Sequence, residues 1–338
     1  MLEISSLTIE ELIEYITSIG EKPFRAKQIF NWLQKGISDF NDMKNLNSTL
    51  IDRLKKDCFL TVCRPKKIQI SADGTRKYLF ELYDGEFIES VFMKYRHGNT
   101  LCISTQVGCR MGCSFCASTA NGKIRDLFPS EMLLQVIEAQ KNTGERISNI
   151  VLMGIGEPLD NYNNVIKFLK AVNNKDGLNI GYRHISLSTC GLVNMFDKLE
   201  SEKMPINLSV SLHAPNDDIR QSIMPIARKY TIDELIQASK KYSEKSGRRV
   251  HFEYTLINNV NDQVKHAEEL GKRLSGMLCH VNLIPLNTTE KNNYKRSEKN
   301  IIKDFTKTLE KYKIDVTVRR SLGTDISAAC GQLRAEAN

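Results

Sequence analysis

The sequence lacks a long apolar run and the features of an exported protein. Its longest stretch free of Lys, Arg, Asp and Glu covers the 16 residues from Leu274 to Thr289, which is shorter than the roughly 20 apolar residues that a membrane-spanning helix needs. The first residues also lack the basic start and apolar core of a signal peptide. We therefore expect a cytoplasmic protein with no membrane partner.

Proline is also scarce, and no segment has the polar bias of a disordered chain. The 338 residues include 8 Pro, 19 Gly and 1 Trp, with 41% apolar and 26% charged side chains, which are ordinary values for a globular protein. We find no low-complexity segment and no internal repeat. The length suits two average domains or one large α/β barrel with an appendage.

Basic residues moderately exceed acidic residues. Lys and Arg number 48 against 40 Asp and Glu, a formal net charge of +8. The excess is concentrated in residues 53–67, with six basic and one acidic residue, and in residues 291–320, with ten and four. Such segments suit a polyanionic partner such as RNA, but solvated helix faces have the same composition. Charge alone leaves both interpretations open.

The apolar periodicity changes along the first hundred residues. Residues 7–56 repeat apolar side chains every three or four positions, which is typical of short packed helices. Strand-like runs follow at 68–70, 77–82 and 87–94, separated by the turn dipeptides Asp73-Gly74 and Asp84-Gly85. We expect a helical accessory domain over 1–60, a small antiparallel β-hairpin extension over 61–97, and a βα domain over 98–338.

Strands and helices alternate in this last region. Strand-like runs begin near residues 101, 149, 184, 206, 250, 280 and 314, with helical segments such as 131–142, 165–173 and 232–243 between them. This alternation predicts parallel βα units. With at least six units and no G-x-G-x-x-G after the first strand, we expect an α/β fold of the partial or full βα barrel type. Its catalytic groups should gather at the C-terminal strand ends.

Nine cysteines are an odd and large number, and they resemble metal ligation in a reducing cytosol more than a disulfide framework. Cys109, Cys113 and Cys116 form a C-x3-C-x2-C run directly after the first barrel strand. Three thiolates on one loop can hold three irons of a 4Fe-4S cluster and leave the fourth iron open to a small molecule. Zinc is the alternative, but structural zinc sites usually take four ligands in two spaced pairs, and no second pair exists here.

The triplet resembles the signature of the radical S-adenosylmethionine (SAM) superfamily. One strand later, the stretch Met153-Gly-Ile-Gly-Glu-Pro-Leu159 is similar to the superfamily's G-E-P motif, which meets the SAM amine. The resemblance implies a radical SAM partial (βα)6-type barrel with one 4Fe-4S cluster on the three cysteines. In the superfamily the open iron binds SAM, and the reduced cluster cleaves it to a 5′-deoxyadenosyl radical.

The C-terminal stretch Ala328-Ala-Cys-Gly-Gln-Leu333, together with the triplet, resembles the RlmN/Cfr family of radical SAM RNA methyltransferases. The likeness covers nearly the whole chain, the N-terminal helical region included. One departure follows Cys116, where residues 117–119 read Ala-Ser-Thr and many members read Ala-Thr-Gly. Further agreement lies in Glu89-Ser-Val, Ser186-Leu-Ser-Thr189, Ser209-Val-Ser-Leu-His-Ala214, Met224-Pro-Ile226 and His280-Val-Asn-Leu-Ile-Pro-Leu-Asn287.

The family resemblance implies catalytic roles for Cys330, Cys102 and Glu89. Cys330 takes a methyl group from one SAM, and a radical made from a second SAM converts it into a methylene radical that adds to adenine. Cys102 then attacks the Cys330 sulfur, releases the base and closes a transient disulfide, while Glu89 accepts the proton of the modified carbon. Taken singly, each cysteine would be a small buried hydrophobe and Glu89 an exposed strand carboxylate.

The resemblance also implies SAM-binding residues near successive strand ends. Hydroxyl, imidazole and amide groups suit hydrogen bonds to the ribose and to the methionine end of SAM. Taken singly, Gly156 would be a turn residue, Ser188 and Asn287 strand-end caps, and His213 a core residue. The implied contacts are Gly156, Glu157, Pro158, Ser188, Ser211, Leu212, His213 and Asn287.

Substrates follow from the same resemblance. The RlmN type methylates C2 of adenosine 2503 in 23S rRNA and C2 of adenosine 37 in tRNAs, whereas the Cfr type methylates C8. Pro158 is typical of the RlmN type, because Cfr-type members tend to carry Ala there. The implied partners are 23S rRNA, tRNA and an external electron donor such as flavodoxin or ferredoxin, and the chain is expected to be a monomer. The two basic segments are expected to dock RNA beside the barrel mouth, with the target base flipped out or unstacked.

Two other function classes remain as alternatives. A radical SAM enzyme that acts on a protein would not need Cys102 or Cys330. A non-enzymatic RNA-binding module with a structural metal would leave the barrel and the G-E-P motif without a role.

Overall fold

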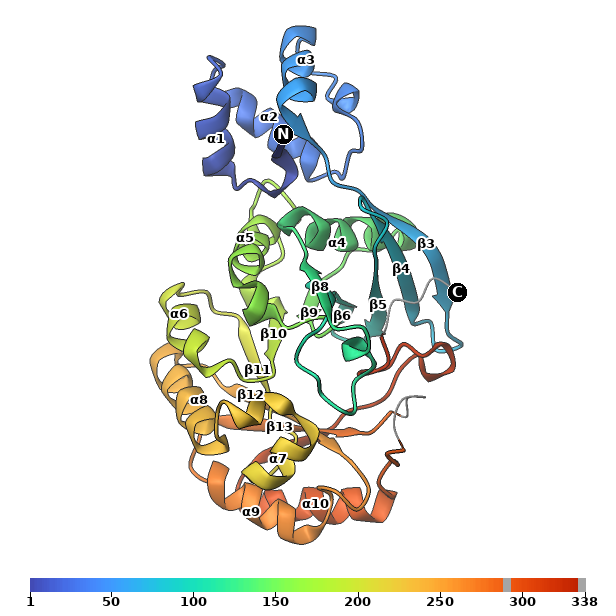
Figure 1. The fold of residues 1–338 in the computed structure, drawn as a ribbon, viewed down its shortest axis with the longest axis vertical. Helices are drawn as coiled ribbons and strands as arrows, with labels where there is room; N and C mark the ends of the chain where they lie inside the picture. The colour runs from blue at the N-terminus through green and yellow to red at the C-terminus, as the bar shows by residue number, and fades with distance from the viewer. Residues whose placement is uncertain (288–292, 334–338) are drawn as a thin grey trace.

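The computed structural model describes residues 1–287 and 293–333, and a ten-stranded sheet runs through its centre (Figure 1). In chain order the strands are β3 (Cys63–Ile70), β4 (Arg76–Leu82), β5 (Phe87–Tyr95), β6 (Gly98–Cys102), β9 (Asn149–Leu152), β10 (Ile185–Thr189), β11 (Asn207–Ser211), β12 (Val250–Leu256), β13 (Cys279–Pro285) and β14 (Asp315–Val318). Each strand pairs with the one before it in this series. Within the described ranges β3 and β14 do not pair with each other, so the sheet is open.

The seven strands from β6 to β14 are parallel and form the barrel. The helices in their connections are α4 (Pro129–Thr143), α5 (Tyr162–Asn173), α6 (Phe196–Ser201), α7 (Asp217–Ile223), α8 (Ile232–Ser246), α9 (Val264–Leu274) and α10 (Lys299–Lys311). Six βα units followed by a final strand confirm the expected partial barrel. All seven strand-like runs of the sequence correspond to these parallel strands.

The barrel strands alternate between an apolar outer face and a polar inner face, since successive side chains point to opposite sides of a strand. Leu187, Leu208 and Phe252 are fully buried in the main apolar core, where the helices cover the sheet. The residues one position along, such as Ser188 and Glu253, line an inner cavity instead. The period-two pattern therefore places polar groups inside the barrel.

Strands β3, β4 and β5 form the predicted antiparallel set and continue the same sheet, because β5 pairs antiparallel with β6. The two predicted turns connect them. Ile70 pairs with Arg76 around the first turn, and Glu81 pairs with Phe87 around the second.

The N-terminal region is helical, as expected. Its elements are β1 (Leu2–Glu3), α1 (Ile9–Ser18), α2 (Phe24–Leu33), α3 (Ser48–Asp57) and β2 (Cys58–Phe59), and they share a separate apolar cluster. Thr8 begins α1 with a capping box, in which it exchanges hydrogen bonds with Glu11. Ser6 contacts Ser130 at the start of α4 at 3.0 Å, and Glu11 pairs with Lys167 on α5. No helix in the described ranges is long and apolar enough to cross a bilayer.

The two basic segments lie in different places. All six basic side chains of residues 53–67 are exposed, three of them on α3. In the second segment Lys291 falls outside the described residues, and Lys295 lies at the barrel mouth, where its carbonyl accepts from the Asn258 N–H at 2.9 Å. The lysines of α10 lie at the opposite end of the molecule from α3 (Figure 1). Helix α10 packs against α9, so the two basic segments do not form one surface, and the docking of RNA by either of them stays a prediction.

Candidate active site

A cavity of about 180 Å³ lies at the C-terminal ends of the parallel strands. Its wall combines the loop with the cysteine triplet, the ends of the barrel strands and the C-terminal segment 319–333. Three residues singled out from the sequence, Glu89, Pro158 and Leu212, do not line it. Those that do are Cys102, Cys109, Cys113, Cys116, Gly156, Glu157, Ser188, Ser211, His213, Asn287 and Cys330.

The cysteine loop is closed by a hairpin of its own. Strands β7 (Gln106–Gly108) and β8 (Lys123–Asp126) pair at its base, and the Cys109 N–H donates to the Gly122 carbonyl at 2.8 Å. Gly108 has a φ of +72°, and a Cβ at this position would lie 1.9 Å from the Gly122 oxygen. Only glycine can therefore close this stem.

The donor set fits an iron–sulfur cluster. Burial raises the pKa of each of the three thiols, that of Cys109 to about 12, and the negative charge of Cys116 raises the pKa values of both Cys109 and Cys113. Because these effects oppose deprotonation, the three thiols can all be thiolates only when a strong cation is bound beside them. Thiols spaced around a cavity suit a cluster in which each iron takes its own cysteine.

Glu157 of the G-E-P motif links two strand ends. Its carboxylate accepts the backbone N–H groups of Leu159, at 2.9 Å, and of Cys190, at 2.6 Å. Burial raises the pKa of Glu157, while the hydrogen bonds from Cys190 and Leu159 oppose this effect. Glu157 also lines the cavity, so its carboxylate is an acidic group that suits a ligand amine.

His213 is a neutral hydrogen-bond donor. Its Nδ1 accepts the Thr255 N–H at 2.9 Å, which leaves the hydrogen on Nε2. Burial, and then the charge of Arg220, lower the pKa of His213 to about 3. The ring packs edge-on against Phe115 of the cysteine loop, with centroids 4.9 Å apart.

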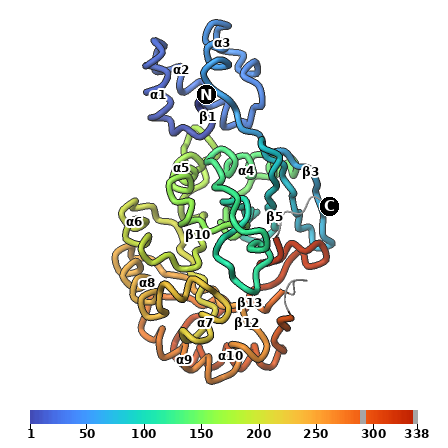
Figure 2. The backbone as a smooth tube through the Cα atoms, viewed as in Figure 1, coloured from blue at the N-terminus to red at the C-terminus, as the bar shows by residue number. Residues whose placement is uncertain are grey.

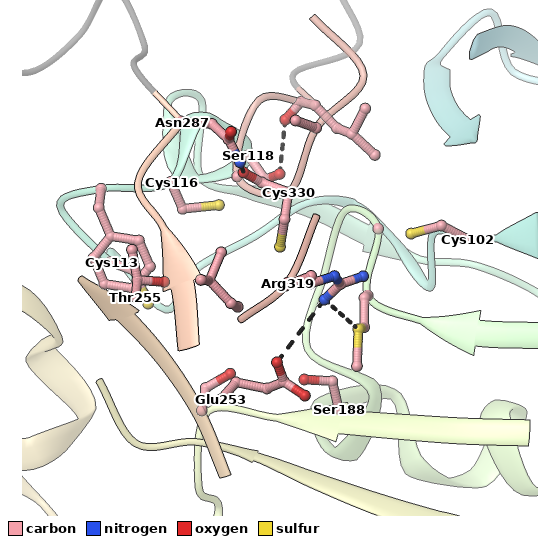
Figure 3. Close-up of a pocket in the computed structure, with 18 of the residues that line it drawn as sticks. Cys102, Cys113, Cys116, Ser118, Ser188, Glu253, Thr255, Asn287, Arg319 and Cys330 are labelled. Atoms are coloured by element: carbon pink, nitrogen blue, oxygen red, sulfur yellow. Dashed lines mark hydrogen bonds and ion pairs between the residues drawn. The ribbon is translucent and has the colours of Figure 1, made fainter. Parts of the chain in front are cut away.

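Cys330 and Cys102 reach the cavity from distant parts of the chain, and both are free thiols. Figure 3 shows the Arg319 guanidinium beside the Cys330 sulfur, on the side of the cavity where Cys102 lies. Burial and the charge of Cys330 raise the pKa of Cys102 to about 12. Cys102 is buried, whereas Cys330 is exposed, so the interpretation of Cys330 as a small buried hydrophobe is wrong. Desolvation by the surrounding cavity wall raises the pKa of Cys330, and the positive charge of Arg319 lowers the pKa of both cysteines.

Two residues hold the C-terminal segment on the cavity side. Asn287 donates from Nδ2 to the Cys330 carbonyl at 3.2 Å, and Ser118 donates to the Leu333 carbonyl at 2.7 Å. Asn287 also accepts from the Ser321 hydroxyl at 3.0 Å. The stretch Ala117–Thr119, where the sequence departs from many family members, thus supports the segment that carries Cys330.

Glu89 is buried, so its interpretation as an exposed strand carboxylate is wrong. Only 5% of the residue is exposed, and its carboxylate pairs with Lys77 at 3.2 Å. Glu89 lies on the same face of β5 as Val91 and Met93, which line the cavity two and four positions along. The carboxylate is therefore next to the cavity wall and outside its lining.

Sequence reasoning missed three charged residues of the site. Glu253 is buried in β12 and accepts from Asn282 at 2.9 Å, while its second oxygen lies 3.9 Å from Arg319. Arg220 is wholly buried, donates to the Cys190 carbonyl at 2.7 Å, and lowers the pKa of Cys113 against the effect of burial. A charged residue inside an apolar strand and an arginine directly after β14 were signals for Glu253 and Arg319.

Comparison with known proteins agrees with this geometry. The family model described as the radical SAM superfamily matches residues 103–270, and that of the ribosomal RNA large subunit methyltransferase N-terminal domain matches residues 2–60. The probable dual-specificity RNA methyltransferase RlmN of Alkaliphilus oremlandii is 55% identical over 98% of this chain and 97% of its own. The protein of the same name from Clostridium novyi is 52% identical over 99% of this chain and 98% of its own.

Solved structures agree as well. The crystal structure of a radical SAM methyltransferase from Sphaerobacter thermophilus superposes with a TM-score of 0.94 at 44% identity, over 99% of this chain and 100% of that one. SuiB from Streptococcus suis, bound to S-adenosylmethionine, has a TM-score of 0.50 at 14% identity over 66% of this chain and 50% of its own, and shares the fold alone. The chain therefore belongs to the RlmN family of radical SAM RNA methyltransferases.

Proposed function

We propose that the protein methylates C2 of adenosine 2503 in 23S rRNA and C2 of adenosine 37 in tRNAs, through an S-methylcysteine at Cys330 and with two SAM per turnover. One observation carries this proposal: Cys330 and Cys102 line the same cavity as the cysteine triplet. Two additional thiols at this place favour a covalent route. Relatives named as dual-specificity RNA methyltransferases support two kinds of RNA substrate.

Cys109, Cys113 and Cys116 would hold the 4Fe-4S cluster, which when bound supplies the electron that cleaves SAM to a radical. SAM would lie against the strand ends. Glu157 would accept from its amine, and the neutral His213 would donate from Nε2. Gly156, Ser188, Ser211 and Asn287 would complete the SAM site from the cavity wall, and Pro158 and Leu212 would shape its backbone.

The first step would be methylation of Cys330. Its thiolate attacks the SAM methyl carbon, a sulfur–carbon bond forms, and S-adenosylhomocysteine leaves. Arg319 favours this step, because its positive charge lowers the pKa of Cys330. The 5′-deoxyadenosyl radical made from a second SAM would take a hydrogen atom from the S-methyl group and become 5′-deoxyadenosine, and the resulting methylene radical carbon would bond to C2 of adenine.

Release of the product would use Glu89 and Cys102. Glu89 takes the proton from C2, a role supported by its position beside Val91 on the cavity side of β5. The adduct radical would also give up one electron to the oxidised electron carrier. The Cys102 thiolate would then attack the Cys330 sulfur, and the sulfur–carbon bond would break with its electron pair on the methylene carbon, which takes up a proton to become the methyl group. The Cys102–Cys330 disulfide that forms would be reopened by the external electron donor.

RNA would dock on the helical domain 1–60 and the adjoining basic residues up to 67, whose basic side chains are exposed. Lys295 and Arg296 would add contacts at the mouth of the barrel domain 98–338. The hairpin extension 61–97 would connect the two. We further propose a cytoplasmic monomer that takes electrons from a flavodoxin or ferredoxin.

The test is mass spectrometry of nucleosides from a 23S rRNA fragment, after anaerobic incubation with reconstituted protein, SAM and reductant. We expect 2-methyladenosine, and none with Cys330→Ala. A product of 8-methyladenosine would show that the protein is of the Cfr type, and it would still be consistent with the S-methylcysteine mechanism. SAM cleavage without any methylated adenosine would contradict the proposal.

A further inference from the structure

The turn between β3 and β4, residues 71–75, contacts the C-terminal segment that carries Cys330. The Asp73 carboxylate accepts two backbone N–H groups, that of Thr75 within the turn and that of Gly323 in the segment, each at 2.9 Å. Burial opposes ionisation, but hydrogen bonds from Thr75 and Gly323 lower the pKa of Asp73 to about 2. The carboxylate is therefore charged at neutral pH, and both hydrogen bonds are charge-assisted.

The C-terminal segment also places a carboxylate against the turn. Asp325 accepts from the Ser71 hydroxyl at 2.6 Å and from the Ala72 N–H at 3.2 Å, and these bonds lower the pKa of Asp325. Two carboxylates, one from each side, thus bridge residues that are about 250 positions apart in the chain.

The fit at this contact is tight. Gly323 has a φ of +62°, and a Cβ there would lie 2.9 Å from the Thr75 side chain and 2.8 Å from Ala328. Lys77, which pairs with Glu89, also donates to the Ser327 carbonyl at 3.4 Å. Figure 2 shows the C-terminal segment passing from this turn along the cysteine loop.

We propose that the β3–β4 turn is an anchor that positions Cys330 in the cavity, with Asp73 and Asp325 as its positioning residues. Residue 325 precedes Cys330 by five positions, so an anchor there restricts where the sulfur can lie. None of the turn residues 71–75 lines the cavity, and the anchor therefore acts through the segment. The role of the anchor in methyl transfer rests on the proposed function of Cys330.

The variant that tests the anchor most specifically is Asp73→Asn. Each carboxylate oxygen of Asp73 accepts one backbone N–H, which cannot become an acceptor, so the amide NH₂ of Asn must face one of these N–H groups even though the Thr75 and Ser71 hydroxyls lie nearby. The matched control is Asp84→Asn in the neighbouring Asp-Gly turn between β4 and β5. Asp84 accepts from the Glu86 N–H and from Arg125, and within the described ranges from no residue of the C-terminal segment.

Hydrogen–deuterium exchange of the cluster-loaded protein, without RNA, tests the anchor directly. In Asp73→Asn we expect peptides over residues 321–333 to exchange about tenfold faster, with α9 unchanged. The control should match the wild type over this segment. Unchanged exchange in both Asp73→Asn and Asp325→Ala would overturn the anchor; the second variant removes an exposed side chain and leaves the turn intact.

Turnover tests the positioning role. We expect the ratio of methylated adenosine to 5′-deoxyadenosine to fall about tenfold in Asp73→Asn, while SAM cleavage stays within about twofold of wild type. A parallel fall of both products would contradict positioning and indicate general destabilisation. If the wild type cleaves SAM but methylates no RNA, the proposed function fails, and faster exchange of residues 321–333 in the variant still supports the anchor.

Discussion

The cysteine loop and the Cys330 segment face one cavity but are held in different ways. The loop is closed by its own β7–β8 hairpin, where Gly108 packs against the backbone of Gly122. The Cys330 segment forms no strand in its described part, residues 319–333, and is held mainly by side chains from remote positions: Asp73, Ser118 and Asn287. Two backbone bonds add to these, from the Ala117 N–H to the Gly331 carbonyl and from the Arg319 N–H to the Leu283 carbonyl, each at 2.8 Å. The loop is thus closed by a local hairpin, whereas the Cys330 segment is fixed by contacts to residues that are remote in the chain.

This difference suits the two proposed tasks. Cluster ligands need a constant spacing, which a closed hairpin stem maintains. A thiol that takes a methyl group, bonds to RNA and then meets Cys102 has to change partners during one turnover. Separate hydrogen bonds, worth about 1 kcal/mol each for the neutral donors Ser118 and Asn287 and about 1.5–3 kcal/mol for the charged Asp73, can be exchanged one at a time, so side-chain contacts allow the Cys330 segment to adjust.

The largest effect should come from Cys330→Ala. Without the methyl-carrying thiol, methylation of RNA should fall by about 10⁴-fold or more, while cluster content and SAM cleavage persist. Product analysis by mass spectrometry measures both. Cys279→Ala, at a buried cysteine of β13 away from the cavity lining, is the control and should retain methylation. Methylation by Cys330→Ala would refute the covalent route.

Replacing the second thiol should trap the intermediate. In Cys102→Ala nothing attacks the Cys330 sulfur, so protein should accumulate in covalent linkage to RNA. A denaturing gel with labelled RNA detects the species. Multiple turnovers without a crosslink would show that Cys102 does not resolve it.

Gly108→Ala should disrupt the cysteine loop, which is the second segment of the comparison. A Cβ 1.9 Å from the Gly122 oxygen must open the stem, so iron and sulfide per chain should fall to about a tenth of wild type. Gly122→Ala is the control, because it shares a positive φ of +68° but has no atom within 4 Å of the added Cβ. Equal iron content in both variants would contradict the role of the stem.

Arg319→Met should have a smaller effect, confined to thiol reactivity. Arg319 lowers the pKa of Cys330, so its removal raises this pKa and reduces the thiolate fraction at neutral pH. The pH profile of Cys330 alkylation by iodoacetamide should move upward, and the reaction at pH 7.5 should be up to about tenfold slower. An alkylation profile equal to that of the wild type would show that Arg319 does not activate Cys330.

The sequence predicted features that depend on neighbouring residues. The seven parallel strands, the two Asp-Gly turns and the cysteine triplet could be located because each carries a local pattern of apolar spacing, turn residues or ligands. The strand ends that line the cavity followed from the barrel topology, which brings Ser188, Ser211 and Glu157 to one end.

Features that depend on distant residues could not be predicted. Glu89 is buried because Lys77 pairs with it and the Cys330 segment passes nearby, and neither contact has a sequence signal. Likewise, nothing near Asp73 indicates its bond to Gly323, and the basic residues of α10 could not be assigned to a face before the helix was placed.

The most direct measurement is a pulse-chase of the methyl group on Cys330. The protein is incubated with methyl-deuterated SAM without RNA, and peptide mass spectrometry should find the peptide of Cys330 carrying one deuterated methyl group. After a chase with RNA and unlabelled SAM, the first 2-methyladenosine formed should carry the deuterium. An unmodified Cys330, or a first product without deuterium, would contradict the covalent transfer of the methyl group through this residue.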